Sequence, residues 1–291
     1  MAEEPVTLSI VIVNWNTCGF LVNALASIYE HAPSEAFEVI VVDNSSSDGS
    51  AEAVAERFPQ VELIRNSANE GYAKGNNMGL ARASGQFVLL LNPDVIVLPG
   101  TLDRAVAYLR EHPDVGAIGA RQIGADDVVQ RSVRGFPTPL AVASEALGLS
   151  RLFPNSRMLS RYRMNWFTYD REMDVDQPMG TFLMISRDAL SRVGHLDERF
   201  PIFFNEVDWC YRAKQAGFRI VFVPEVSIIH YGGASTRLVA AEMAWESRRG
   251  LLAYYRKHYR AAYHWPVYAL AAATSWLHAW YCSSRRRREG S

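Results

Sequence analysis

The sequence predicts an α/β fold with a mostly parallel central sheet. Short apolar runs alternate with helix-like segments along the first third of the chain, and polar or turn-forming residues follow each run. The chain has 291 residues, of which 49% are hydrophobic and 21% charged, so it is long enough for one sizeable domain or two smaller lobes. Its net charge of -1 argues against general nucleic-acid binding, which needs a basic surface.

Four apolar runs in the first third are the predicted strands. They occupy residues 8–13, 38–42, 61–65 and 87–91, and the helices between them are expected at residues 20–30 and 51–57 and around Lys74, ending at Gly85. Parallel strands joined by right-handed crossovers have their carboxyl ends on one side of a sheet. One crevice should therefore be lined by the polar residues that follow the strands, which are Asn14, Asp43, Asn69 and Asp94.

Asp43 is open to two interpretations. It is placed to accept hydrogen bonds from the imide of a pyrimidine base or from ribose hydroxyls, or it forms an Asx-turn or helix cap. Gly71, Gly75 and Gly79 are too loosely spaced for a dinucleotide-binding fingerprint, and the chain lacks the GxxxxGK[ST] motif. Neither a dinucleotide cofactor nor a P-loop nucleotide is therefore indicated.

Asn92-Pro93-Asp94 ends an apolar run, residues 87–91, that is typical of a fully buried strand. Pro93 cannot donate to a sheet ladder and ends this strand. An ionised carboxylate is costly to bury unless it is paired or binds a cation, so Asp94 is a candidate for holding a ligand. The alternative is an ordinary turn residue or the N-cap of the next helix.

The second half contains a candidate general base. A small-residue entry, Gly180-Thr181, leads into an apolar strand, and a helix is expected from Glu206 to about Ala216. Glu206 and Asp208 in its first turn are open to a helix-dipole explanation. The phenylalanines that precede Glu206 favour a catalytic interpretation, because apolar surroundings raise the pKa of a carboxylate toward that of a useful base.

Two further strands are expected at residues 219–223 and 226–229. The second ends at His230, which two glycines follow after Tyr231, a setting like that of Asp94. Residues 119–176 show the weakest pattern of strands and helices in the chain. Within them, Arg131 and Arg134 either bind an acceptor diphosphate or merely cover the surface. The three widely spaced cysteines, Cys18, Cys210 and Cys282, are interpreted as reduced thiols.

The carboxyl-terminal segment changes composition. Residues 263–282 are uncharged and rich in Ala, Trp and Tyr, and four arginines, Arg285 to Arg288, follow. Its length and polar residues favour an interfacial helix on an anionic membrane over a spanning one. The alternative is a terminal helix packed on the catalytic domain or in an oligomer interface. The acidic amino terminus lacks the features of a signal peptide.

Seven ordered motifs in roughly residues 8–237 resemble those of the inverting family-two glycosyltransferases, in particular their rhamnosyltransferase-like branch. They are SIVIVNWN, VVDNSSSDGS, NEGYAKGNN, LLLNPD, GTFLMI, FFNEVDWCYRAKQAGFRI and IHYGGAST. The resemblance implies a GT-A fold, with a mostly parallel, Rossmann-like central sheet flanked by helices and a carboxyl-terminal helical extension. It divides the chain into a nucleotide-sugar-binding half (1–118), an acceptor-binding and catalytic half (119–237) and a helical, membrane-associating segment (238–291).

The resemblance also implies roles for individual residues. Asp43 matches the acid that holds the nucleobase, Asn92 and Asp94 fall on the Asp-x-Asp element, and Glu206 matches the catalytic base. Asp94 and His230 are the expected ligands of Mg²⁺ or Mn²⁺. The donor-binding set is Asn14, Asp43, Asn69, Lys74, Asn92 and Asp94, and the acceptor-binding set is Gly180, Thr181, Asp208, Arg131 and Arg134. Asn92 and Asn205 depart from the family pattern, each an amide where many relatives have an acid.

The implied activity is transfer of a sugar from a dTDP- or UDP-sugar to a glycan or polyprenyl-diphosphate-linked acceptor, with rhamnose from dTDP-rhamnose favoured. The expected location is the cytoplasmic face of the inner membrane, and the expected process is cell-surface polysaccharide synthesis. No nucleic-acid partner is expected, and an oligomer is possible. Alternatives are transfer of another hexose or of galactofuranose, and a non-catalytic sugar-nucleotide-binding protein. A nucleotidyltransferase is disfavoured because residues 9–17 contain no Arg or Lys.

Overall fold

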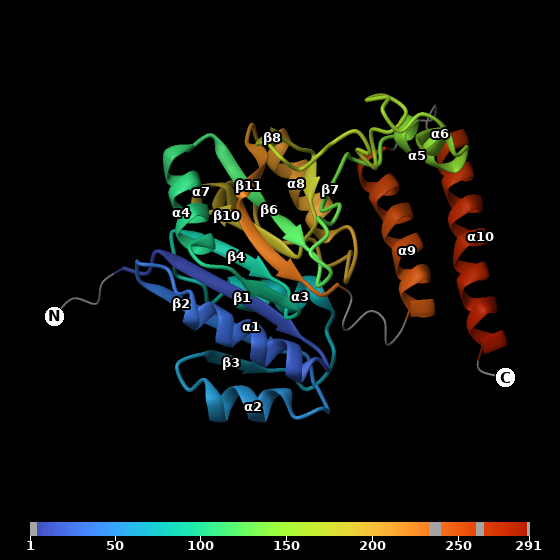
Figure 1. Ribbon diagram of the computed structural model, residues 1–291. Helices are drawn as coiled ribbons and strands as arrows, with labels where there is room; N and C mark the ends of the chain where they lie inside the picture. The colour runs from blue at the N-terminus through green and yellow to red at the C-terminus, as the bar shows by residue number, and fades with distance from the viewer. Residues whose placement is uncertain (1–4, 233–239, 260–264, 290–291) are drawn as a thin grey trace.

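A mixed sheet runs through the computed structural model, which describes residues 5–232, 240–259 and 265–289 (Figure 1). Its nine described strands lie in the order β3-β2-β1-β4-β10-β6-β11-β5, with β8 paired to β11. The strands are β1 (Leu8–Asn14), β2 (Phe37–Asp43), β3 (Glu62–Arg65), β4 (Phe87–Leu91), β5 (Val95–Val97), β6 (Val115–Ile123), β8 (Met173–Asp174), β10 (Phe182–Ser186) and β11 (Arg219–His230). A separate small sheet pairs β7 (Val133–Arg134) with β9 (Gln177–Pro178).

Helices cover both faces of the large sheet. One apolar layer joins it to α1 (Cys18–Glu30), α2 (Ser50–Arg57) and α4 (Thr101–Glu111), and the other joins it to α3 (Tyr72–Leu80), α7 (Arg187–Val193) and α8 (Asn205–Gln215). Every residue of β1 and β4 is buried. This two-sided burial explains why their sequences are continuously apolar instead of alternating.

The predicted α/β class is confirmed, and β3, β2, β1 and β4 are mutually parallel as expected. The second half differs in two ways. β10 runs antiparallel to both β4 and β6, and the two strands expected after residue 219 form the single strand β11. Its register shifts between Val223 and Ser227. Pro224 lies in this irregularity, where its missing N–H breaks no regular ladder bond, so the strand continues to His230.

The short strand β5 returns along the end of β11. It runs antiparallel to β11, with Val95 opposite His230, and the N–H of Tyr231 donates to the carbonyl of Asp94 at 3.1 Å. The chain therefore reverses directly after Pro93. This reversal, which local sequence patterns do not reveal, brings Asp94 and His230 side by side.

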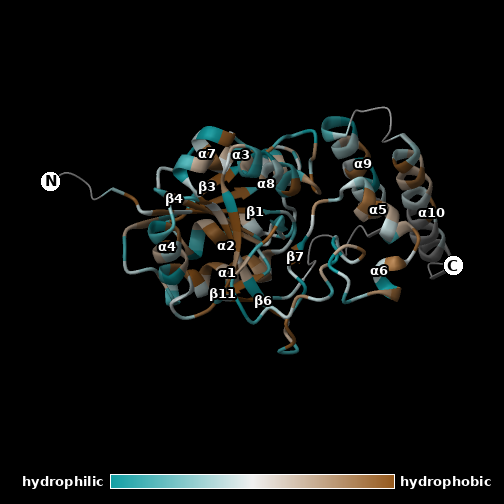
Figure 2. Ribbon diagram, turned by 90° about the horizontal axis from the view of Figure 1, so that it is seen from above, coloured by the Kyte–Doolittle hydropathy of each residue, from teal (hydrophilic) through white to brown (hydrophobic). Residues whose placement is uncertain are grey.

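The carboxyl-terminal helices lie beside the sheet together with two helices from the middle of the chain. They are α5 (Pro139–Ala146), α6 (Leu149–Leu152), α9 (Ala240–His258) and α10 (Trp265–Glu289). Figures 1 and 2 both show α10 next to α9 and α5, and contacts join these helices. In the described part of the chain, no helix is both long enough and apolar enough to cross a membrane.

Close packing of α3 on β1 depends on Gly79. A Cβ added there would lie 2.3 Å from a methyl carbon of Val11, whereas one added at Gly19 in α1 would meet nothing within 4 Å. We expect Gly79→Ala to lower the free energy of unfolding by about 1–3 kcal/mol through overpacking. Gly19→Ala should be neutral or stabilise by up to about 1 kcal/mol. Urea unfolding followed by circular dichroism measures both, and equal stability of the two variants would contradict the packing argument.

Candidate active site

The ends of β1 and β2 form a buried hydrogen-bond network. Asn14 and Asp43 are register partners, and the Asn14 amide donates to an Asp43 carboxylate oxygen at 2.9 Å and to the Ser46 hydroxyl at 3.1 Å. The second Asp43 oxygen accepts from the Ser46 N–H at 2.9 Å. Both side chains are nearly inaccessible to solvent. The network fixes Asp43 at the strand end and leaves it lone pairs for further donors.

The loops after β1 and β2 are held against each other. The N–H of Asn16 donates to Ser46 Oγ at 3.0 Å, and its side chain accepts from the Ser47 N–H at 2.8 Å. Asn16 and Ser45 both have positive φ, at 52° and 61°. Such left-handed backbone in residues other than glycine is uncommon and tends to cluster at ligand-binding sites. The residues Asn16, Thr17, Cys18, Gly19, Phe20, Asn23 and Asp48 line a hollow beside these loops.

Asn69 and Lys74 lie on the loop and helix after β3. Asn69 is exposed and accepts from the N–H of Gly71, while Lys74 pairs with Glu70 at 2.7 Å on the surface. Hydrogen bonding to Glu70 raises the pKa of Lys74. Asn44 donates to the Gly71 carbonyl at 3.1 Å and thereby links this loop to the end of β2. Asn69 and Lys74, the two predicted donor-binding residues, thus lie toward the surface on the loop and helix next to the Asn14–Asp43 network.

Asp94 and His230 face each other at the ends of β4 and β11. Their side chains are almost fully buried, and His230 Nε2 lies 3.6 Å from Asp94 Oδ1. Gln130 holds the histidine twice: its amide nitrogen donates to the His230 carbonyl at 2.9 Å, and its amide oxygen lies 2.8 Å from His230 Nδ1. The carbonyl can only accept, which fixes the orientation of the Gln130 amide. Nδ1 therefore carries the proton, and Nε2 is the nitrogen turned toward Asp94.

This pair has the chemistry of a cation site. Two ligands about 2.1 Å from one small divalent cation are at most about 4.2 Å apart, so a separation of 3.6 Å fits. A carboxylate oxygen and an imidazole nitrogen suit Mn²⁺, and Mg²⁺ commonly completes its shell with waters and substrate phosphates. Within the described residues, no group of three or more His, Cys, Asp or Glu side chains gathers. Asn92 is half-buried, and its N–H donates to the Thr181 carbonyl at 3.0 Å.

Glu206 lies in the first turn of helix α8. Burial raises its pKa to about 7, although the residue keeps a partial opening to solvent. Gly180 lies against it, since a Cβ built there would be 3.6 Å from Glu206 Cγ. The hydroxyl of Tyr72 donates to the Gly180 carbonyl at 3.0 Å. The pKa of Tyr72 is raised by burial and by the charges of Glu206 and Asp94, so both carboxylates act on the Tyr72 hydroxyl.

The start of α8 is strained and is supported by α9. Phe204 has a left-handed backbone with φ of 68°, which is costly for a bulky residue. Its ring lies 5.9 Å from that of Tyr254, and an added Cβ at Gly250 would meet the Phe204 ring at 2.7 Å. Asn205 donates to the Phe200 carbonyl at 3.3 Å. Packing by α9 thus holds the backbone that aims Glu206.

Asp208 is not placed to contact an acceptor. Its carboxylate is fully buried and is shared by Arg212 at 2.8 Å, Lys257 at 2.5 Å and His258 at 2.7 Å. Lys257 and His258 belong to α9. The expected acceptor role of Asp208 is therefore corrected to a structural one, because a fully buried carboxylate that joins α8 to α9 is not accessible to a ligand.

Arg131 and Arg134 lie along the edge that leads to Gly180. Arg134 is opposite Gln177 in the β7–β9 sheet, and the N–H of Met179 donates to the Ser132 carbonyl at 2.7 Å. The guanidinium of Arg131 is exposed and bonds Asn165, and that of Arg134 bonds the carbonyls of Arg131 and Val133. Both arginines thus lie on the segment that pairs with the residues before Gly180.

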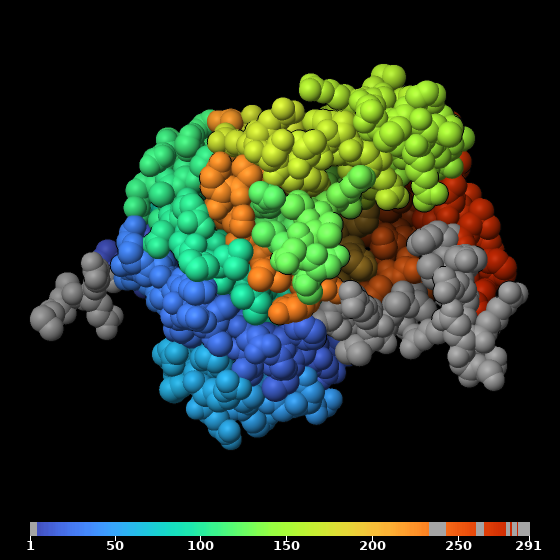
Figure 3. Space-filling view, viewed as in Figure 1, coloured from blue at the N-terminus to red at the C-terminus, as the bar shows by residue number. Residues whose placement is uncertain are grey.

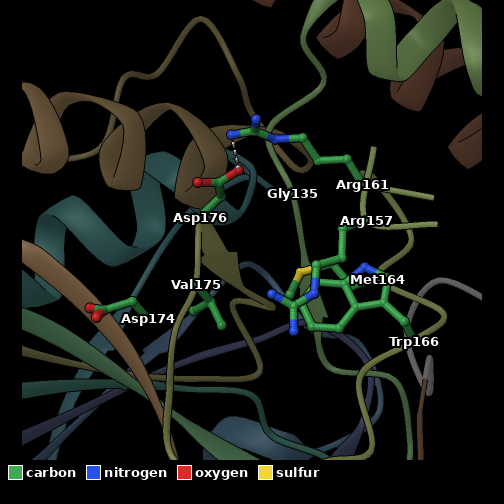
Figure 4. Close-up of a pocket in the computed structure, with 8 residues that line it drawn as sticks. All are labelled: Gly135, Arg157, Arg161, Met164, Trp166, Asp174, Val175 and Asp176. Carbon is green, nitrogen blue, oxygen red and sulfur yellow. Dashed lines mark ion pairs between the residues drawn. The ribbon is translucent and has the colours of Figure 1, made fainter. Parts of the chain in front are cut away.

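A second hollow lies next to this edge and is shown in Figure 4. Its lining residues are Gly135, Arg157, Arg161, Met164, Trp166, Asp174, Val175 and Asp176. Arg161 pairs with Asp176 at 3.6 Å, and the guanidinium of Arg157 lies 5.0 Å from the Trp166 ring centre. Asp176 also pairs with Lys214 at 3.2 Å. These contacts brace the segment between β7 and β9 against α8.

Sequence patterns miss several residues that shape the site. Gln130 lies in an irregular loop far from His230 in sequence, and Tyr72 reaches Gly180 across the two halves of the chain. Phe20 and Tyr231 form an exposed ring pair, 5.4 Å between centres, beside the Asp94–His230 pair. Of these missed residues, Phe20 and Tyr231 had a local sequence signal, because each is an aromatic residue close to a motif.

The sheet, the polar loops at its carboxyl edge and the facing glutamate define a GT-A glycosyltransferase. The chain belongs to glycosyltransferase family 2, whose model matches residues 9–194. It is 29% identical over 240 residues to the N-acetylglucosaminyl-diphospho-decaprenol L-rhamnosyltransferase of Mycobacterium tuberculosis, covering 79% of this chain and 77% of that one. It is 23% identical over 217 residues to the rhamnosyltransferase WbbL of Escherichia coli, covering 71% and 77%.

Solved glycosyltransferases share the fold. A mannosyltransferase from Pyrobaculum calidifontis, solved with GDP-Man and Mn²⁺, superposes with a TM-score of 0.59 and 19% identity, covering 99% of this chain and 77% of that one. Residues 1–349 of S. aureus TarS superpose with a TM-score of 0.56 and 16% identity, covering 93% and 80%. The predicted family and its GT-A fold are therefore confirmed.

The Asp208 network should contribute to stability. Asp208→Ala leaves Arg212 and Lys257 without their buried partner and should cost about 3–5 kcal/mol in free energy of unfolding. Burial raises the pKa of Asp208, but hydrogen bonds from His258, Lys257 and Arg212 outweigh it and lower the pKa overall. The stabilisation should therefore be complete above about pH 4 and fade as the pH falls further.

Denaturant unfolding at several pH values measures this loss. The control is Asp188→Ala, which removes an exposed carboxylate that pairs with Arg192 at 3.4 Å and should change stability by less than about 1 kcal/mol. Similar losses for the two variants would show that the Asp208 network is not stabilising.

Proposed function

We propose that this glycosyltransferase is an inverting, metal-dependent rhamnosyltransferase that uses dTDP-rhamnose and a polyprenyl-diphosphate-linked acceptor. The observation that carries the mechanism is the position of Glu206, a buried carboxylate with a pKa raised to about 7, beside Gly180 and near enough to Tyr72 that its charge acts there together with that of Asp94. The substrates are suggested by the named activity of the Mycobacterium tuberculosis relative. Residues 1–118 bind the donor, 119–237 serve catalysis and acceptor binding, and 238–291 associate with the membrane.

Glu206 is the general base in this mechanism. A carboxylate with a pKa near the working pH is a good acceptor for the proton of an attacking hydroxyl. The acceptor oxygen attacks the anomeric carbon as the bond to the donor diphosphate breaks, in one displacement that inverts the configuration. Gly180 leaves room for the sugar next to the base, because any larger side chain there would point at Glu206. The transition state should resemble the oxocarbenium-like state of glycoside hydrolysis.

The donor binds at the carboxyl ends of β1, β2 and β4. Asp43, held by Asn14 and Ser46, accepts from the nucleobase or ribose, and the loop around Asn16 encloses the nucleoside. Asn69, Lys74 and Asn92 lie farther along the same edge. Asp94 and His230 would hold Mg²⁺ or Mn²⁺, which when bound neutralises charge that grows on the leaving diphosphate. Gln130 would keep Nε2 of His230 directed toward that cation.

The acceptor approaches from the β7–β9 side. Gly180 and Thr181 lie at the entrance to Glu206, and Arg131 and Arg134 along the same edge offer positive charge for a diphosphate. α10 has exposed Trp265, Trp276 and Trp280 and fits the interfacial helix expected from the sequence. The side chains of Arg285 to Arg288 and of Cys282 lie outside the described residues. Peripheral attachment at the cytoplasmic face of the membrane follows from this acceptor.

Transfer of rhamnose is distinguished from transfer of another hexose or of galactofuranose by the donor that the protein binds. A thermal-shift comparison of dTDP-rhamnose with UDP-hexoses and UDP-galactofuranose, each with Mn²⁺, separates these donors, since a bound ligand stabilises the folded protein in proportion to its affinity.

Replacing the base should abolish transfer without preventing donor binding. We expect Glu206→Gln to lower turnover by about 10²–10⁴-fold. In the wild type, kcat/KM should rise with pH up to about 7 and level off above it, because the base must be unprotonated. Radiolabelled rhamnose transfer measures the rate, and thermal shift with dTDP-rhamnose checks binding. Glu56→Gln, on the exposed surface of α2, is the control; near-normal turnover of folded Glu206→Gln would exclude this base.

Loss of the Gln130 contacts should weaken metal binding. Gln130→Ala frees the His230 ring to rotate, and removal of such a supporting hydrogen bond typically costs 10–100-fold in metal affinity. Electron paramagnetic resonance of Mn²⁺ with dTDP present measures the dissociation constant without turnover. Gln86→Ala, which alters an exposed glutamine just before β4, should leave the dissociation constant unchanged. Equal Mn²⁺ affinity of both variants would remove Gln130 from the metal site.

A further inference from the structure

Exposed apolar side chains are concentrated on the segment that contains α5 and α6. Leu140, Leu147, Leu152, Phe153 and Met158 are each between 52% and 71% exposed. They account for five of the thirteen large exposed hydrophobic residues in the described part of the chain. Figure 3 shows this segment as a yellow-green lobe that projects above the carboxyl-terminal helices. Apolar exposure of this density on a soluble surface usually marks a binding face.

Basic side chains accompany these apolar ones. Residues 139–167 contain four arginines and one acid, Glu145, which pairs with Arg163. Arg161 is paired with Asp176, but Arg151 and Arg157 are exposed and form no ion pair with any described residue. The surface thus combines large apolar groups with uncompensated positive charge. We call Leu147, Leu152, Phe153, Met158, Arg151 and Arg157 the α5–α6 surface.

We propose that the α5–α6 surface docks onto a lipid bilayer that carries anionic headgroups. Leu152, Phe153 and Met158 enter the boundary between headgroups and acyl chains, and Arg151 and Arg157 contact lipid phosphates. The alternation of large apolar residues with arginines matches a bilayer interface better than a folded protein partner, because long arginine side chains can reach the headgroups while their neighbours insert. This element is separate from the carboxyl-terminal segment in sequence, and α10 packs against α5 beside it (Figure 2).

The position of the surface in the chain connects the bilayer to the catalytic side. The whole segment is inserted between β7 and β9, whose end leads directly to Gly180 beside Glu206. Its return is tied down by the Gly135 N–H, which donates to the Tyr162 carbonyl at 3.0 Å. Docking there would place the entrance to Glu206 near the membrane surface. The choice of a bilayer rests partly on the proposed lipid-linked acceptor, whereas the docking surface rests on its own side chains.

Vesicle binding of the full-length protein tests the proposal. The probes are vesicles of phosphatidylcholine alone and of phosphatidylcholine with phosphatidylglycerol. Wild type should cosediment with the anionic vesicles, more weakly with neutral ones and more weakly at high salt. Leu152→Glu/Phe153→Glu and Arg151→Glu/Arg157→Glu should each lower the partition coefficient at least about tenfold, since each removes a major component of interfacial binding. Arg57→Glu/Arg82→Glu, exposed arginines near α2 and α3, should bind like wild type.

The outcomes separate this proposal from its alternatives. All altered side chains are exposed, so thermal unfolding should match that of wild type. Unchanged vesicle binding by both double variants overturns the proposal. A dimer in sedimentation equilibrium that Leu152→Glu/Phe153→Glu dissociates, with vesicle binding unchanged, would instead identify the surface as an interface between copies.

Failure of the proposed function has a different signature. Docking variants should transfer sugar normally to a short, water-soluble acceptor analogue but poorly to the same acceptor in vesicles. Glu206→Gln should bind vesicles like wild type and transfer to neither. Wild type that binds anionic vesicles through this surface but transfers no rhamnose would leave docking intact and refute the proposed reaction.

Discussion

Burial of the central sheet on both faces is the constraint on which the rest of the structure depends. A strand covered on both sides can present side chains to a ligand only where it ends, and β1, β2 and β4 all end at the same edge. Asn14, Asp43 and Asp94 are therefore together because of strand direction. The antiparallel β5 adds the end of β11 to this edge and with it His230. The arrangement of the strands therefore determines where these site residues lie.

The position of Glu206 depends on packing between helices. Glu206 has an elevated pKa because α8 begins inside the protein, and α8 begins there only with Phe204 held in a left-handed conformation. Contacts with α9 compensate for that strain, through Tyr254 and Gly250 at one point and through Asp208 with Lys257 and His258 at another. Helix α9 thus supports the start of α8, where Glu206 lies. A membrane-facing role for α10 and a supporting role for α9 are compatible, because different helices carry them.

The segment between β7 and β9 connects the candidate active site to the α5–α6 surface. It leaves the domain next to Gly180, carries exposed apolar and basic side chains, and returns to the strand that enters the site. Its inner side is braced by paired charges such as Arg161 with Asp176, while Arg151 is exposed and Arg157 is exposed beside the Trp166 ring. An acceptor with a soluble head and a lipid tail needs both environments within a short distance. This segment offers them on one continuous stretch of chain.

The sequence by itself determined the family, the fold class and most strand and helix positions, because buried strands and their polar ends are written in local patterns of apolar and turn residues. Those patterns also singled out Asp43, Asp94, Glu206 and His230. Only the tertiary structure decided that β10 is antiparallel, that β11 is one strand, and that Gln130 holds His230. It also moved Asp208 from the acceptor side into a buried charge network. The physical reason is that pairing, enclosure and hydrogen-bond partners join residues far apart in the chain, and no local pattern encodes which distant groups will meet.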